Sequence, residues 1–194
     1  MMPGLFITVE GGEGAGKSSL MERIAGWLGD QGQNVIQTRE PGGTDLAEKI
    51  RDIILSDDHS ELCDQSELLL LFAARAQHLS ELIRPALARG DTVLCDRFTD
   101  ATWAYQGGGR NMSHALIGRL EDMVHGDLQP DLTLLLDLPV EVGMRRALHR
   151  GEADRIEQEP LTFFERVRAA YLRRAEEQSQ RFVIIDASLS LEQV

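Results

Sequence analysis

The stretch GGEGAGKS, at residues 11–18, constrains the fold more than any other part of the sequence. It fits the pattern G-x-x-x-x-G-K-[ST] and stands between an apolar run, LFITVE at 5–10, and a helical pattern at 19–32. Glycines let the backbone turn so that successive N–H groups point at phosphate oxygens, and the following helix directs its positive end at the same place. The sequence therefore predicts a strand, a phosphate-binding loop and a helix in this order.

The side chains of this loop indicate which part of a nucleotide it binds. Lys17 can reach the β- and γ-phosphates of ATP or GTP, and Ser18 offers a hydroxyl oxygen to Mg²⁺. A glycine-rich turn without function is the alternative, and the strand and helix patterns on both sides argue against it. The sequence contains no N-K-x-D motif of the kind that reads guanine. The predicted ATP-binding residues are Gly11, Gly12, Glu13, Gly14, Ala15, Gly16, Lys17, Ser18 and Ser19.

Apolar runs alternate with helical patterns along the whole chain. The patterns predict strands at 5–10, 34–39, 91–96, 131–139 and 182–187, and helices at 19–32, 44–56, 65–88, 113–126, 140–149 and 161–178. This alternation favours an α/β fold, in which helices cover both faces of a five-stranded parallel sheet. The run at 131–139 is continuously apolar, as is typical of a strand buried on both faces. We find no linker or repeat and expect one domain over residues 1–194.

Single residues add detail to the predicted helices. Gly32 is expected to end the first helix, and Thr44 or Asp45 to cap the second. Pro85 should kink or end the long helix at 65–88, because proline lacks the N–H that a helix interior requires. The apolar residues of the 44–56 helix are expected to share one face: Leu46, Ile50, Ile53 and Ile54.

The composition bounds the environment and partners of the chain. Its net charge of −12 argues against a nucleic-acid surface, although a pocket on an acidic protein can still be locally positive. The richest apolar run, LLLLFAA at 68–74, is too short to span a bilayer, and MMPGLFITVEGG lacks the features of a signal peptide. Cys63 and Cys95 lie far apart and are expected to be free thiols. We therefore expect a cytoplasmic protein that binds neither nucleic acid nor membrane.

Two polar clusters follow predicted strands, which is where ligands bind in open α/β sheets. The first, TREPGGT at 38–44, contains Arg39 and a tight turn that begins at Pro41. The second opens with Asp96, which can hold the Mg²⁺ shell directly or through water, and with Arg97, which can clamp a phosphate. For the first cluster, the structural alternative is a loop turn with a surface arginine. For the second, it is a polar surface helix.

Two further groups of side chains suit a planar base. If residues 99–106 are helical, Thr102 and Gln106 share one face, with Tyr105 beside them, and offer a hydroxyl and an amide to a base edge. Phe72 and Arg75 are three residues apart in LLLLFAARAQH, and a ring and a guanidinium could together stack on and bond a base. A core phenylalanine beside a surface arginine is the alternative for this second group.

Taken together, these segments resemble the thymidylate kinase family. The motifs VEGGEGAGKS, TREPGGT, ELLLLFAARAQH, CDRFTDATWAYQGGGR, PDLTLLLDLP and RGEADRIEQE occur in the family's order and cover nearly the whole chain. The resemblance implies a P-loop nucleoside-monophosphate-kinase fold, a homodimer, and the reaction dTMP + ATP → dTDP + ADP with Mg²⁺. It also implies a further helix beyond LSLEQV, whereas this sequence stops at Val194.

The resemblance further implies individual roles on the acceptor side. Arg97 would hold the dTMP phosphate with help from Arg39, and Glu13 would face the 3′-hydroxyl of the acceptor sugar. The side chain of Tyr105 would occupy the place of a ribose 2′-hydroxyl and so favour deoxyribose. Phe72 would stack on thymine, Arg75 would bond its exocyclic oxygen, and Thr102 and Gln106 would read the base. The dTMP-binding residues implied are Glu13, Arg39, Pro41, Phe72, Arg75, Arg97, Thr102, Tyr105 and Gln106, and the metal-binding residues are Ser18 and Asp96.

The charged segment RGEADRIEQE, at 150–159, resembles the family's lid, which we place at about residues 148–160. One form of the family carries an arginine inside the P-loop, where this chain has Gly14 and Ala15, and the other form supplies the positive charge from the lid. The chain is similar to the second form. The predicted catalytic residues are therefore Lys17, Arg97, Arg150 and Arg155, with Arg150 the stronger lid candidate.

Two other functions remain open from the sequence. The chain could be a kinase for another nucleoside monophosphate or for a deoxynucleoside. It could also be a regulatory or binding protein that keeps the fold without the phosphoryl transfer. A solvated charged loop is the structural alternative for the lid segment.

Overall fold

The computed structural model describes residues 4–59, 61–148 and 154–189 of the 194-residue chain. Within these ranges it contains a sheet of five parallel strands in the order β2-β3-β1-β4-β5. The strands are β1 (Phe6–Gly11), β2 (Val35–Arg39), β3 (Thr92–Asp96), β4 (Leu132–Asp137) and β5 (Phe182–Asp186). The predicted α/β fold and all five predicted strands are confirmed.

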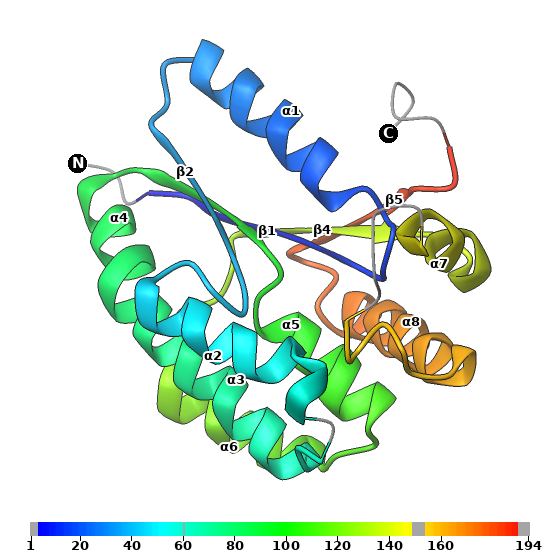
Figure 1. The fold of residues 1–194 in the computed structure, drawn as a ribbon. Helices are drawn as coiled ribbons and strands as arrows, with labels where there is room; N and C mark the ends of the chain where they lie inside the picture. Colours follow the sequence, from blue (N-terminus) through cyan, green and yellow to red (C-terminus); the bar gives the residue numbers. More distant parts are fainter. Residues whose placement is uncertain (1–3, 60, 149–153, 190–194) are drawn as a thin grey trace.

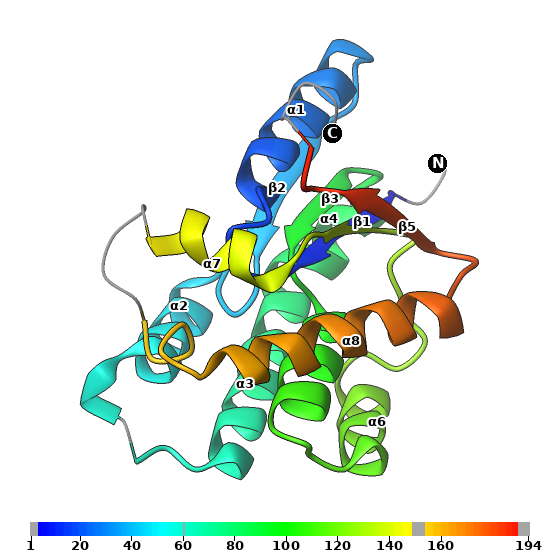
Figure 2. The same cartoon turned by 90° about the vertical axis from the view of Figure 1, so that its right-hand side faces the viewer.

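Helices cover both faces of this sheet (Figures 1 and 2). Helix α1 packs on one face against β1 and β3, whereas α4, α5 and α8 lie on the other face. Helix α7 stands beside the end of β1 that leads into the P-loop. The helices are α1 (Lys17–Asp30), α2 (Asp45–Leu55), α3 (Asp64–His78), α4 (Arg84–Arg89), α5 (Thr99–Thr102), α6 (His114–Val124), α7 (Val140–Leu148) and α8 (Leu161–Glu177). Two π-helical segments, η2 (Leu79–Ile83) and η3 (Trp103–Gly109), and a short 3₁₀ turn, η1 (Asp57–His59), complete the order.

The long helix predicted at 65–88 does not end at Pro85 but continues to Arg89. It runs as α3, then the π-helical η2, then α4, and Pro85 stands in the first turn of α4. A proline ring fits the first turn of a helix, because the N–H that proline lacks would have no partner within that turn. The π turn ahead of it, which is wider than an α turn, separates α3 from α4. The other two capping predictions agree with the structure, since Thr44 caps α2 through a bond from the Ala47 amide at 3.3 Å and Gly32 has a positive φ of 79° just after α1.

The strand β1 is buried more completely than β4. Every residue of β1 is buried, because it lies in the middle of the sheet, whereas β4 has partly exposed positions and neighbours the edge strand β5. On one face of β1, Ile7 and Val9 pack against α1, and on the other, Phe6 packs against η2 and Phe98. Both faces of β4 still join the core, Leu134 and Leu136 on one side and Leu135 on the other, as the apolar run at 131–139 predicts.

The buried face of α2 differs in part from the predicted one. Ala47 and Ile54 are buried, whereas Leu46 is 49 % exposed and Ile53 is 40 % exposed. Both pairs are seven residues apart, so each marks a stripe along the helix, and tertiary packing selects the stripe of smaller residues. Of the four residues predicted to share the buried face, Ile54 is buried and Ile50 is half-buried, so the prediction is right for these two and wrong for Leu46 and Ile53.

The sheet brings the loops of the site to one edge. Asp96, at the end of β3, pairs in register with Val9 of β1 and with Arg39 of β2, so the segments that follow these three strands emerge side by side. No described helix is long and apolar enough to cross a membrane.

Candidate active site

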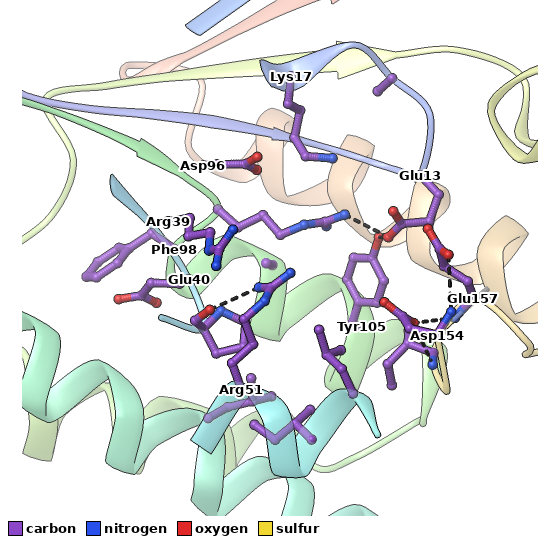
Figure 3. A pocket seen from close by; sticks show the side chains of 18 of the residues that line it. Glu13, Lys17, Arg39, Glu40, Arg51, Asp96, Phe98, Tyr105, Asp154 and Glu157 are labelled. Atoms are coloured by element: carbon purple, nitrogen blue, oxygen red, sulfur yellow. Dashed lines mark hydrogen bonds and ion pairs between the residues drawn. The ribbon is translucent and has the colours of Figure 1, made fainter. Parts of the chain in front are cut away.

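A cavity of about 450 Å³ lies at this edge of the sheet (Figure 3). Its walls come from the P-loop, the turn after β2, one face each of α2 and α3, the residues after β3, α5 with η3, one residue of α7, and the segment 154–157. The predicted site residues that line it are Glu13, Gly14, Ala15, Gly16, Lys17, Ser18, Ser19, Arg39, Pro41, Arg75, Asp96, Arg97, Thr102, Tyr105 and Gln106. Gly11, Gly12, Phe72 and Arg155 do not line it, and Arg150 lies outside the described residues.

The P-loop holds its lysine against its own backbone. The Lys17 amine donates hydrogen bonds to the carbonyl oxygens of Gly11, at 3.3 Å, and Gly12, at 3.0 Å. Burial of the amine, and then the nearby charge of Arg97, lower the pKa of Lys17. Gly14 and Gly16 have φ values of 64° and 91°, which favour glycine and give the loop its turn. Gly11 and Gly12 thus belong to the loop as acceptors for Lys17 rather than as cavity lining.

Arg97 and Glu13 form an ion pair in the wall of the cavity. The Arg97 guanidinium donates to Glu13 Oε1 at 2.7 Å and to the Tyr171 hydroxyl at 3.3 Å, and its Cζ lies 4.8 Å from the centroid of the Tyr105 ring. Tyr105 donates to the same Glu13 oxygen at 2.8 Å. Burial alone would lower the pKa of Arg97, but Tyr105 and Glu13 raise it well above its usual value. Arg97 is therefore a permanent cation, and its φ of 67° turns it out of β3 into the cavity.

A second group of cations lines the cavity after β2. Arg39 donates to Glu48 Oε2 at 2.7 Å, and Arg51 donates to the carbonyl oxygen of Pro41 at 3.0 Å. The side chain of Arg39 is 53 % exposed, so its ion pair with Glu48 adds little stability and its guanidinium can change partner at low cost. Arg51 was not among the predicted site residues, and it enters the cavity from α2 beside Pro41.

Arg75 is fixed in place at the buried end of the cavity. Its Nε donates to Glu40 Oε2 at 2.7 Å, and its Nη2 donates to Phe98 O at 3.2 Å and Thr102 Oγ1 at 3.1 Å. Its Nη1 is buried and has no hydrogen-bond partner among the described residues. A buried donor without a partner is costly, so this nitrogen is available to an acceptor on a ligand.

Leu71, and not Phe72, forms the apolar part of the cavity wall on α3. Phe72 is 2 % exposed and packs in a core cluster with Leu68 and Ile117. Its ring still lies under the Arg75 guanidinium, with 4.9 Å from Arg75 Cζ to the ring centroid. Leu71 thus faces the cavity where Phe72 does not, and the stacking of Phe72 on a base stays a prediction.

Arg155, which was predicted to be a catalytic arginine of the lid, contacts α2 and α3 in the structure. Its guanidinium donates to Glu67 Oε2 at 2.5 Å and to Ile54 O at 2.8 Å, and its backbone amide donates to Leu55 O at 3.2 Å. These partners lie on α3 and at the end of α2, and they line the same cavity as the P-loop. In this arrangement Arg155 anchors the segment 154–159 instead of facing a phosphate. The prediction that both lid arginines approach the phosphate thus finds no support from Arg155.

Asp96 and Ser18, the residues expected to bind Mg²⁺, both line the cavity. Asp96 Oδ1 is buried and has no hydrogen-bond partner among the described residues, and the exposed Ser18 also lines the cavity. Within the described ranges, no three His, Cys, Asp or Glu side chains are grouped so as to hold a metal. This agrees with the preference of Mg²⁺ for a few protein ligands completed by water and nucleotide phosphates.

Several cavity residues escaped sequence reasoning. Glu67, Leu71 and Arg75 are spaced by four along α3, and counting back in fours from Arg75 would have found the first two. Phe98 lies next to Arg97 and is buried against Phe6. Arg146 enters from α7 and donates to Ala187 O at 2.9 Å, a contact between distant segments for which the sequence gives no signal.

Comparisons with known proteins agree with this geometry. A family model described as Thymidylate kinase matches residues 9–194. The chain is 58 % identical over 193 residues to thymidylate kinase of Pseudomonas syringae pv. tomato, covering 100 % of this chain and 92 % of that protein. It is 60 % identical over 190 residues to the enzyme of Pseudomonas entomophila, covering 98 % and 90 %.

A solved structure gives the same result in three dimensions. Thymidylate kinase from Ehrlichia chaffeensis superposes with a TM-score of 0.78 at 34 % identity and covers 94 % of this chain and 93 % of its own. The matches in sequence and in structure both extend over nearly the whole chain. The chain therefore belongs to the thymidylate kinase family.

Proposed function

We propose that the protein transfers the γ-phosphoryl group of ATP to dTMP, giving dTDP and ADP, within a single domain of residues 1–194. The observation that carries this proposal is one cavity lined both by the P-loop and by a buried arginine with a vacant donor, Arg75. Membership of the thymidylate kinase family supports the same reaction. A P-loop alone would fit any nucleotide-dependent protein, so the acceptor wall distinguishes a kinase from a regulatory protein.

On the donor side, residues 11–19 of the P-loop would bind the ATP phosphates. Their backbone N–H groups and the N-terminus of α1 favour negative charge at this place. Lys17 would exchange its bonds to Gly11 and Gly12 for bonds to the β- and γ-phosphates. Its amine is held within the loop before a ligand arrives, which lowers the cost of ordering it.

On the acceptor side, the cations of the cavity would bind the dTMP phosphate. Arg97 and Arg39 are the predicted pair, and Arg51 supports them because its guanidinium reaches Pro41 on the same wall. Glu13 and Tyr105 would contact the deoxyribose, since both line the cavity next to Arg97. Arg75, Thr102 and Gln106 would bind the base, with Leu71 against its apolar surface.

The chemistry demanded of these residues is mainly electrostatic. The acceptor is a phosphate dianion that needs little activation by a base, so the barrier lies in bringing two anions together and stabilising the transferring group. Lys17 and Arg97 supply fixed positive charge at this point. We propose Arg150 as the lid arginine that adds to it, because the P-loop offers only Gly14 and Ala15 where other family members place an arginine.

Asp96 and Ser18 are the proposed ligands for Mg²⁺, which would neutralise phosphate charge when bound. The buried Asp96 Oδ1 supports this role, since a vacant carboxylate oxygen can accept a bond from metal-bound water. The family resemblance also supports a homodimer located in the cytoplasm, and light scattering of the purified protein would measure the dimer directly.

A coupled assay of ADP formation tests the proposed function. The protein is mixed with ATP and Mg²⁺ and with dTMP, dUMP, dCMP or AMP in separate reactions. We expect ADP release to be strongest with dTMP. Preference for another monophosphate would indicate a kinase of different specificity, and ADP release that no acceptor stimulates would indicate a regulatory protein.

A further inference from the structure

Glu67 is a buried carboxylate in the cavity wall to which the reaction above assigns no role. It lies on α3, and its oxygens accept hydrogen bonds from Gln106 Nε2 at 2.8 Å, Arg110 Nη2 at 3.3 Å and Arg155 Nη2 at 2.5 Å. Burial alone would raise the pKa of Glu67, but the bonds from Arg155 and Gln106 and the charge of Arg110 bring it below the usual value. Glu67 therefore stays ionised and acts only as an acceptor.

This acceptor decides which way the Gln106 amide faces. A glutamine amide has a donor end, the NH₂ group, and an acceptor end, the carbonyl oxygen. An ionised carboxylate at 2.8 Å can pair only with the NH₂ group. The carbonyl oxygen of Gln106 is consequently the end left for a ligand in the cavity that Gln106 lines.

The same wall then offers one donor and one acceptor. Arg75 Nη1 is the vacant donor, and Gln106 Oε1 is the acceptor. Thymine and uracil present the complementary edge, with an acceptor at O4 and a donor at N3–H. Cytosine presents the reverse, a donor at N4 and an acceptor at N3, so it would oppose both protein groups.

We propose that Glu67 is a positioning residue that determines base specificity, because it holds Gln106 as a hydrogen-bond acceptor and so selects a pyrimidine with N–H at position 3. Arg110 and Arg155 contribute by keeping the carboxylate charged and in place. Arg155 comes from the segment 154–159, so the lid is tied to base recognition at this point. The inference rests on the proposed function, since it assigns the specificity of the same site.

The test compares dTMP with 5-methyl-dCMP, which share the methyl group and sugar and differ at the base edge. In Glu67→Gln the new amide can donate as well as accept, so Gln106 is free to turn. We expect the ratio of kcat/KM for dTMP over 5-methyl-dCMP to fall about tenfold, the effect of one hydrogen bond to a charged group. Arg75 preserves the remaining preference, and the KM for ATP should stay the same. An unchanged ratio in a folded Glu67→Gln protein refutes the proposal.

Glu121→Gln is the matched control. Glu121 is also a buried carboxylate that accepts side-chain hydrogen bonds, from Trp103 Nε1 at 2.6 Å and Gln129 Nε2 at 2.9 Å, but it does not line the cavity. We expect this variant to lose stability and to keep the preference for dTMP. An equal loss of preference in both variants would mean general loosening and would overturn the proposal.

A second measurement does not require a variant to fold. In ¹⁵N-labelled wild-type protein with dTMP bound, the side-chain NH₂ protons of Gln106 should exchange slowly with water, because they are held by a buried carboxylate. Rapid exchange of these protons would contradict the role of Glu67. Wild-type protein that releases no ADP with dTMP would instead disprove the proposed function, so the two failures are distinguishable.

Discussion

In the cavity wall, Arg97 Nη2 and Glu13 Oε1 are 2.7 Å apart, and the two side chains suit different parts of a nucleotide. The arginine attracts a phosphate, whereas the carboxylate repels one and must be directed at hydroxyl groups. Tyr105 donates to the same Glu13 oxygen, so the three side chains form one unit next to the P-loop. Their positions agree with the roles that the family resemblance implied, and those roles remain proposals.

Arg150 carries the most specific prediction for a single residue. Arg150→Ala should lower kcat on the order of 10³-fold, the effect of a transferring-group arginine in P-loop enzymes, and change the KM for dTMP much less. Arg145→Ala is the control, because Arg145 is an exposed arginine of α7 that does not line the cavity. Steady-state kinetics at saturating ATP measure both, and an unchanged kcat in Arg150→Ala would exclude the role.

Leu71 and Phe72 are neighbours whose replacement should have opposite consequences. Leu71→Ala removes apolar surface from the cavity, so we expect a KM for dTMP raised about tenfold with a small loss of stability. Phe72→Ala empties a buried core position and should cost about 3–5 kcal/mol of unfolding free energy. Urea unfolding and steady-state kinetics on both variants check this. A raised KM for dTMP in Phe72→Ala, with an unchanged KM in Leu71→Ala, would instead place Phe72 at the base.

At the scale of elements, the strands and most helices could be predicted because apolar periodicity is a local property. The π-helical segments η2 and η3 could not, since their geometry depends on what they pack against. Gly109 of η3 illustrates this, because a Cβ there would lie 2.4 Å from the Phe163 ring of α8. The rotation of α2 is likewise set by packing, which explains why Leu46 and Ile53 are exposed although they were expected to share the buried face.

The close approach of η3 to α8 leads to a prediction for Gly108. A Cβ at this position would lie 2.5 Å from Ala170 Cβ and 3.0 Å from Arg166 O. Gly108→Ala should therefore cost about 1–3 kcal/mol and, by displacing η3, raise the KM for dTMP. Gly118→Ala in α6 is the control, since its nearest neighbour would be 4.0 Å away, and we expect it to gain up to about 1 kcal/mol. Thermal unfolding distinguishes the two, and equal stability of both variants would contradict the packing argument.

At the scale of the whole molecule, a buried carboxyl under the site links stability to pH. Glu10 of β1 accepts bonds from the Phe98 amide at 2.7 Å and the Tyr171 hydroxyl at 2.8 Å. Burial, and then the charge of Asp100, raise the pKa of Glu10 to about 8 from an ordinary 4.5. The folded protein therefore keeps a proton that the unfolded chain releases, so this contribution to stability is complete below pH 4.5 and is lost as the pH rises through about 8.

Glu10→Gln imitates the protonated carboxyl and should remove this dependence. In the wild-type protein the contribution of Glu10 falls by up to about 1.4 kcal/mol per pH unit between the two pKa values. We expect the free energy of unfolding, measured with urea between pH 5.5 and 8, to fall less steeply with pH in the variant than in the wild-type protein. Identical slopes for the two proteins would show that Glu10 is ionised throughout this range.

The cations of the cavity share one feature with a consequence for ligand turnover. Lys17 is bonded to two backbone carbonyls, Arg97 to Glu13, and Arg39 to Glu48. In each case a protein group competes with the nucleotide for the cation. A nucleotide therefore replaces this protein partner when it binds, and the protein pair forms again when the nucleotide leaves. Such a site binds small anions from solution weakly and releases a highly charged product quickly, but its affinity for the nucleotides is lower than that of unpaired cations would be.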